Sequence, residues 1–262
     1  MDSNLFKIVS YTDVMVGLFD SGSGGLTVLT ALRKQAPNAD VVYFGDIAHA
    51  PYGIRSAENL AFLTHQGVRV LKSFGAEALV SACNSVSMSV LAGAAGDMPF
   101  IEMSLPTAEY LKRYPGQRFL LIATPATIAS GLYERAVQGI VSIDPLPIAD
   151  LAGVIEFGEP EDVIQYILDD AFSSRAGERY DGLILGCTHY PLVRDSIAKI
   201  GRKFFGGLRL VDPAYPVADA VCRKFDVEGN SKTIFLISKR SDEFEKKARS
   251  LGFDYILKVI DL

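Results

Sequence analysis

Short apolar runs alternate with longer amphipathic segments along nearly the whole chain. The clearest apolar runs lie at 16–19, 41–44, 79–82, 119–122 and 183–185, and each is followed by small or polar residues. Apolar runs of this length, bounded by turn residues, are typical of buried strands, and the segments between them have the length of helices. The alternation therefore predicts an α/β fold with largely parallel sheets.

The remaining pattern extends the same alternation to the C-terminus. The tail predicts a strand at 233–237, a helix at 241–251 and a strand at 255–259, and Ser241 followed by acidic residues is typical of a helix start. Residues before Val16 are predicted to form a short extension. The proline-rich stretch 144–160 is predicted to be irregular. Helices are predicted at 26–35, 57–74, 106–114, 161–172, 192–200 and 213–225, with another ending near Gly139.

Composition narrows the class of protein. The chain has 262 residues, of which 49% are hydrophobic and 22% charged, as in globular enzymes. The net charge of −5 gives no indication of nucleic-acid binding. No apolar run approaches the ~20 residues of a membrane span. Three cysteines without a secretory pattern predict reduced thiols in a cytoplasmic protein.

Two of the cysteines occupy matching positions at strand ends. Cys187 lies in Gly-Cys-Thr-His-Tyr-Pro after the strand at 183–185, and Cys83 lies in Cys-Asn-Ser after the strand at 79–82. In open α/β sheets, ligands bind at this end of the strands. The two cysteines are 104 positions apart in the chain, which predicts two similar halves facing each other across a cleft.

Several interpretations of these thiols are open. A strand-end cysteine is by default a small buried hydrophobe, and Cys222 in an amphipathic segment is interpreted in that way. A metal site made of Cys83, Cys187 and His189 would be incomplete, so no metal is predicted. A cysteine hydrolase would use Cys187 alone and leave Cys83 without a role. Proton transfer to and from a carbon atom uses both thiols.

Several motifs taken together resemble glutamate racemase. They run in order from about Val16 to the C-terminus, and Ser85 replaces the threonine that is usual after Cys-Asn in that family. The matching segments are Asp20-Ser21-Gly22, Gly24-Gly25-Leu26-Thr27-Val28, Pro51-Tyr52-Gly53, Ala82-Cys83-Asn84, Thr124-Pro125-Ala126-Thr127 and Leu185-Gly186-Cys187-Thr188-His189-Tyr190-Pro191-Leu192.

The resemblance implies a cofactor-independent racemase that interconverts L- and D-glutamate and supplies D-glutamate for peptidoglycan. It also implies a homodimer of chains with two α/β domains and the active site between them. The first domain would comprise 1–104 plus 213–262 and carry Cys83, and the second would comprise 105–212 and carry Cys187. The alternatives are a racemase for aspartate or another small acid, and a catalytically silent binding protein.

By the same resemblance, Cys83 removes the proton from D-glutamate with help from Asp20, and Cys187 removes it from L-glutamate with help from His189. Glu156 is the best counterpart of the family's acidic assistant, and Asp150 competes for that role. The implied substrate-binding residues are Asp20, Ser21, Pro51, Tyr52, Gly53, Cys83, Asn84, Ser85, Thr124, Thr127, Cys187, Thr188 and His189.

Overall fold

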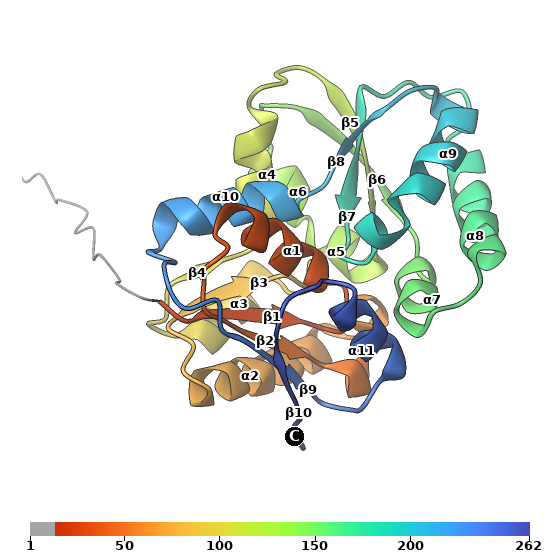
Figure 1. Ribbon diagram of the computed structural model, residues 1–262. Coiled ribbons are helices and arrows are strands. Elements are labelled where there is room, and N and C mark those ends of the chain that lie inside the picture. The colour runs from red at the N-terminus through yellow and green to blue at the C-terminus, as the bar shows by residue number, and fades with distance from the viewer. Residues whose placement is uncertain (1–13) are drawn as a thin grey trace, which may run out of the picture.

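The computed structural model describes residues 14–262 and contains two sheets in which every strand pair is parallel (Figure 1). The predicted N-terminal extension lies almost entirely outside these residues. The first sheet has the order β10 (Ile256–Val259), β9 (Thr233–Ile237), β2 (Val41–Gly45), β1 (Val16–Asp20), β3 (Ala78–Ser81) and β4 (Phe100–Ile101). The second has the order β6 (Ser142–Pro147), β5 (Arg118–Ala123), β7 (Gly182–Gly186) and β8 (Arg209–Val211). The predicted α/β class is confirmed.

The first sheet is covered by helices on both faces. One face carries α2 (Ala57–Ser73) and α3 (Met88–Ala95), and the other carries α1 (Leu26–Gln35), α10 (Ala214–Lys224) and α11 (Asp242–Arg249) (Figure 1). Consecutive residues of one strand point to opposite faces, so Phe44 packs on the α2 side and Tyr43 on the α1 side. Burial on both faces explains why these strands are continuous apolar runs.

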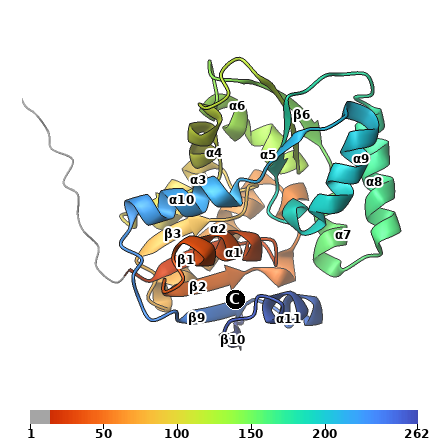
Figure 2. The same cartoon turned by 45° about the horizontal axis from the view of Figure 1, so that its top comes forward.

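The second sheet packs in the same way. Its outer face carries α7 (Leu151–Phe157), α8 (Glu161–Ser173) and α9 (Arg194–Phe205), and its inner face carries α4 (Ser104–Leu111) and α6 (Leu132–Ala136), which follows α5 (Pro125–Ser130) (Figure 2). Leu121 of the second sheet and Tyr43 of the first belong to one continuous apolar core. The two sheets are therefore packed into one body through their inner helices.

The first sheet contains β1, which begins at Val16, and β9 and β10 near the C-terminus, whereas the strands of the second come from one continuous stretch between Arg118 and Val211. This organisation has the same form as the predicted division into 1–104 plus 213–262 and 105–212. The boundaries themselves stay a prediction, because α4 packs against both α6 and α10 at the junction.

The prediction of an irregular stretch at 144–160 is wrong, since it contains β6 and α7. Pro145 and Pro147 argued against a strand because proline has no amide hydrogen to donate. However, β6 is an edge strand that pairs only with β5, where proline is tolerated. The helix predicted to end near Gly139 is also divided, into α5 and α6, at Gly131 with a left-handed φ of 58°.

Parallel pairing brings the carboxyl ends of the strands to one edge of each sheet. Asp20 ends β1, Cys83 follows β3, Thr124 follows β5 and Cys187 follows β7. These edges carry every polar motif that the sequence placed at a strand end. No helix between residues 14 and 262 is long and apolar enough to cross a membrane.

Candidate active site

Cys83 and Cys187 are both buried at the carboxyl edges of the two sheets, each with 6% of its surface exposed. Burial raises the pKa of the Cys83 thiol to about 12, and the negative charge of Asp20 adds to this rise. A smaller contribution to the same shift comes from charge on Cys187. The Cys83 thiol is therefore held in its protonated form at neutral pH.

Hydrogen bonds join the two edges around the thiols. Thr188, next to Cys187, donates its hydroxyl to Asp20 Oδ2 at 3.1 Å. The hydroxyl oxygens of Ser85 and Thr124 lie 3.0 Å apart. These contacts connect residues that are 168 and 39 positions apart in the chain. The structure thus brings the predicted site residues of both halves together.

On the Cys187 side, an imidazole and a carboxylate follow the thiol in line. Cys187 Sγ lies 3.7 Å from His189 Nδ1, and His189 Nε2 donates to Glu156 Oε2 at 2.6 Å. The same carboxylate oxygen accepts the Ser23 amide at 2.8 Å and the Ser23 hydroxyl at 2.6 Å. Asp150, the competing acid, is exposed at the start of α7. The geometry therefore favours Glu156 as the partner of His189.

The electrostatics of this group favour a charged pair. Burial opposes the charge on His189, but hydrogen bonds to Cys187 and Glu156 outweigh it and raise the pKa of His189 to about 10. Burial likewise opposes ionisation of Glu156, but hydrogen bonds from His189 and Ser23 lower its pKa to about 2. An imidazolium held against a carboxylate can stabilise a thiolate on Cys187.

On the Cys83 side the neighbouring group is a carboxyl, not an imidazole. Asp20 is fully buried, and its Oδ1 accepts the amide of Gly22 at 2.9 Å. Burial raises the pKa of Asp20, and the positive charge of His189 limits the rise. A carboxyl whose pKa is raised is suited to exchange a proton with a thiol. The two thiols thus have chemically different partners.

Amide and hydroxyl donors lie beside the thiols. Tyr133 donates to Asn84 Oδ1 at 2.6 Å, while the buried Asn84 Nδ2 has no hydrogen-bond partner. The hydroxyl of Thr124 lies 3.0 Å from that of Thr127 and accepts the Thr127 amide at 3.4 Å, at the start of α5. An unpaired amide donor close to hydroxyls at a helix N-terminus is suited to hold a carboxylate.

The predicted residues Pro51, Tyr52 and Gly53 lie at a short 3₁₀ turn, η2 (Tyr52–Ile54), against the second half. The Tyr52 hydroxyl donates to the buried carboxylate of Asp46 at 2.6 Å, which fixes the orientation of the buried Tyr52 ring. A Cβ added at Gly53 would lie 2.4 Å from Thr124 Cβ. Only glycine allows this close approach. Of the remaining predicted residues, Ser21 lies at the Cys83 thiol, where its hydroxyl favours the thiolate.

Four residues of this region were not among the predicted site residues: Ser23, Asp46, Tyr133 and Lys247. Ser23 and Tyr133 contact the predicted residues Glu156 and Asn84. Ser23 lies in the glycine-rich loop after β1, and the sequence of that loop could have identified it as a candidate site residue. Tyr133 and Lys247 carry no local signal, because each reaches the site through the tertiary fold.

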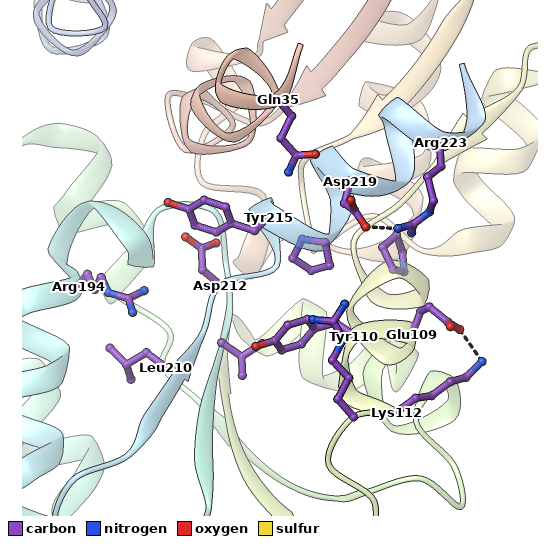
Figure 3. Close-up of a pocket in the computed structure, with 14 residues that line it drawn as sticks. Gln35, Glu109, Tyr110, Lys112, Arg194, Leu210, Asp212, Tyr215, Asp219 and Arg223 are labelled. Carbon is purple, nitrogen blue, oxygen red and sulfur yellow. Dashed lines mark hydrogen bonds and ion pairs between the residues drawn. The ribbon is translucent and has the colours of Figure 1, made fainter. Parts of the chain in front are cut away.

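A large cavity lies away from the thiols, at the junction of α4, α10 and β8 (Figure 3). Its volume is about 890 Å³, and its lining includes Tyr110, Arg113, Arg194 and Asp212 but neither cysteine. A smaller hollow of about 320 Å³ lies between η2 and α7, next to the site. The volume of a cavity therefore does not identify the region of the two cysteines in this structure. Within residues 14–262, no group of three or more His, Cys, Asp or Glu side chains could hold a metal ion.

Residues 26–220 match the family model described as Asp/Glu/hydantoin racemase. The glutamate racemase of Aquifex aeolicus is 35% identical over 241 residues, covering 88% of this chain and 91% of the relative. The glutamate racemase of Persephonella marina is 34% identical, covering 94% and 97%.

Among solved structures, the glutamate racemase isoform RacE1 from Bacillus anthracis superimposes with a TM-score of 0.84. It is 29% identical and covers 96% of this chain and 99% of its own. The similarity therefore extends over both sheets and both cysteine motifs.

Proposed function

The chain belongs to the Asp/Glu/hydantoin racemase family and is an amino-acid racemase, and from this premise we propose that it interconverts L- and D-glutamate without a cofactor. The substrate is proposed from the relatives at 34–35% identity, which are glutamate racemases over nearly their whole length.

One observation carries the chemical part of the proposal. Two buried thiols lie at the carboxyl edges of two opposed parallel sheets, each beside its own ionisable partner. Racemisation requires a base on one face of the α-carbon and an acid on the other. A pair of thiols from two halves of a chain supplies both groups, whereas a hydrolase would need only one.

In the proposed L-to-D direction, the Cys187 thiolate removes the α-proton and Cys83 donates its proton to the opposite face. His189 stabilises the thiolate before this step. The high pKa of Cys83 keeps that thiol protonated at neutral pH, as a donor must be. In the D-to-L direction Cys83 gives its proton to Asp20, and the resulting thiolate removes the α-proton. Cys187, which regains its proton from His189, donates it to the opposite face.

Stabilisation of the carbanion falls to the neutral donors of the site. The free Asn84 amide and the hydroxyls of Ser85, Thr124 and Thr188 are proposed to hold the substrate carboxylate as negative charge develops next to it. Fixed donors in a buried site need no reorganisation during the reaction, and removal of one typically costs about 10²–10³-fold in rate. The proposal also includes a cytoplasmic homodimer that supplies D-glutamate for peptidoglycan synthesis, which rests on the resemblance alone.

Substitution of each thiol tests the mechanism. Cys83→Ala and Cys187→Ala are each expected to lower kcat for glutamate racemisation by at least about 10³-fold, because each removes an acid–base group. Circular dichroism at a fixed wavelength follows racemisation, and Cys222→Ala is the control. In heavy water the wild-type product should carry deuterium at the α-carbon. Normal racemisation by Cys83→Ala would contradict the two-thiol mechanism. If aspartate were racemised faster than glutamate, the proposed substrate would be wrong and aspartate would take its place.

A further inference from the structure

Lys247 of α11 reaches the candidate site from the C-terminal part of the chain. Its Nζ donates to Ser23 Oγ at 3.0 Å, to the carbonyl oxygen of Ile155 at 2.9 Å and to that of Glu156 at 3.1 Å. An ammonium group has three hydrogens to donate, so all of them are used. A half-buried lysine with three fixed acceptors is held in one position.

Two of these acceptors are carbonyls in the last turn of α7. Gly158 and Glu159 both donate their amides to Val154, which leaves the carbonyls of Ile155 and Glu156 without a backbone partner. A cation at the C-terminal end of a helix also interacts favourably with the helix dipole. Lys247 therefore caps the helix that carries Glu156.

The third acceptor links Lys247 to the Glu156 carboxylate itself. Because Ser23 Oγ accepts from Lys247, its own hydrogen is directed to Glu156 Oε2 at 2.6 Å. The same oxygen accepts from His189 Nε2 at 2.6 Å. The backbone and the side chain of Glu156 are thus both fixed by contacts that begin at Lys247.

The position of α11 makes this contact a connection between the two halves. The strands on either side of α11, β9 and β10, belong to the first sheet, whereas α7 covers the second, and the two helices lie side by side in both views (Figures 1 and 2). The contact is close, because a Cβ added at Gly158 would lie 2.9 Å from the Glu243 side chain of α11.

We propose that Lys247 is a positioning residue that holds Glu156 against His189 and thereby orients the acid–base group of Cys187. This role rests on the proposed racemase function. Its consequence is that the C-terminal helix, distant in sequence from both cysteine motifs, sets the activity of one thiol and not of the other.

The first test is a double-mutant cycle on kcat/KM for glutamate. Lys247→Met keeps the length of the side chain and removes its donors, and it is expected to lower kcat/KM by about 10-fold, as for a lost hydrogen bond to a charged group. Lys246→Met in the same helix is the control, because Lys246 is 75% exposed and its ion pair is with Glu243 of the same helix. In the Glu156→Gln background, Lys247→Met should have less than a twofold further effect. A full tenfold effect in that background would show a merely structural role and overturn the proposal.

The second test does not depend on the substrate. The alkylation rates of Cys83 and Cys187 by iodoacetamide are measured by mass spectrometry in the same sample. General loosening of the protein would accelerate both reactions, since both thiols are equally buried. Loss of Glu156 positioning removes support for the Cys187 thiolate only, so the Cys187-to-Cys83 ratio should fall severalfold in Lys247→Met and stay unchanged in Lys246→Met. An unchanged ratio in Lys247→Met overturns the proposal.

Absence of glutamate turnover by the wild type would instead contradict the proposed function. The alkylation ratio would then remain as the test of Lys247.

Discussion

At the scale of single residues, two identical thiols are made different by their neighbours. Cys83 lies near the buried carboxyl of Asp20, and its pKa is raised to about 12. Cys187 lies 3.7 Å from an imidazole that is held by Glu156. Cys83 is therefore kept protonated, whereas Cys187 lies beside the positively charged imidazolium of His189. In the proposed mechanism, this asymmetry assigns proton removal from L-glutamate to Cys187 and proton donation to Cys83.

The His189 environment predicts how stability depends on pH. The ordinary pKa of histidine is 6.5, and here it is raised to about 10. The folded state thus keeps a proton that the unfolded chain loses, so the stabilisation is complete below pH 6.5 and is lost as pH rises toward 10. The free energy of unfolding of the wild type should exceed that of His189→Gln by more at pH 6 than at pH 10.

Urea unfolding followed by circular dichroism at pH 6, 8 and 10 measures this difference. The raised pKa of Cys83, ordinarily 9.0, also lowers the free energy of unfolding at alkaline pH. This contribution is present in both proteins, so it cancels in the difference between them. A difference between wild type and His189→Gln that stays constant with pH would contradict the assigned charge state of His189.

At the scale of elements, the sequence predicted the strands that are buried on both faces and failed at an edge. Apolar runs such as that of β7, short and bounded by turn residues, are typical of strands buried on both faces. The β6 strand contains Pro145 and Pro147, and its tolerance of proline depends on having a neighbour on one side only. That information is not local. The short helix α7 was missed with it, although the candidate Glu156 was named without it, and the structure places Glu156 on that helix against His189.

The contact between η2 and α5 supports a prediction at the same scale. Gly53→Ala places a Cβ 2.4 Å from Thr124 Cβ, which one side chain cannot relieve without movement of the backbone. We expect a loss of roughly 1–3 kcal/mol in the free energy of unfolding, as for overpacked cores, and at least a tenfold lower kcat/KM for glutamate. Urea unfolding and the racemisation assay measure the two effects.

Gly207→Ala is the matched control, because nothing lies within 4 Å of its added Cβ and its φ lies outside the left-handed region that favours glycine. It should change neither quantity. If Gly53→Ala kept full activity, the close approach of η2 to Thr124 would not be needed by the site.

At the scale of the whole molecule, the candidate site is assembled from segments that span most of the chain. Asp20 and Cys187 belong to different sheets, and Lys247 comes from the helix between β9 and β10. Motifs at strand ends could be found in the sequence because the fold places them by a general rule. Tyr133 and Lys247 could not, because each lies on an ordinary amphipathic helix and acquires its contact only when the two halves pack together.

The same assembly predicts how the protein responds to substrate. A ligand held between the halves binds the folded state alone, so D-glutamate at 100 times its Kd should stabilise the protein by about 2.7 kcal/mol and raise Tm by several degrees. Bound glutamate should also slow iodoacetamide alkylation of the two buried thiols, Cys83 and Cys187. The reference within the same sample is Cys222, which lies half-buried in α10 outside the site. It should react at an unchanged rate. Equal slowing of all three cysteines would indicate a general effect of the ligand on the protein, and a substrate site between the halves would then be wrong.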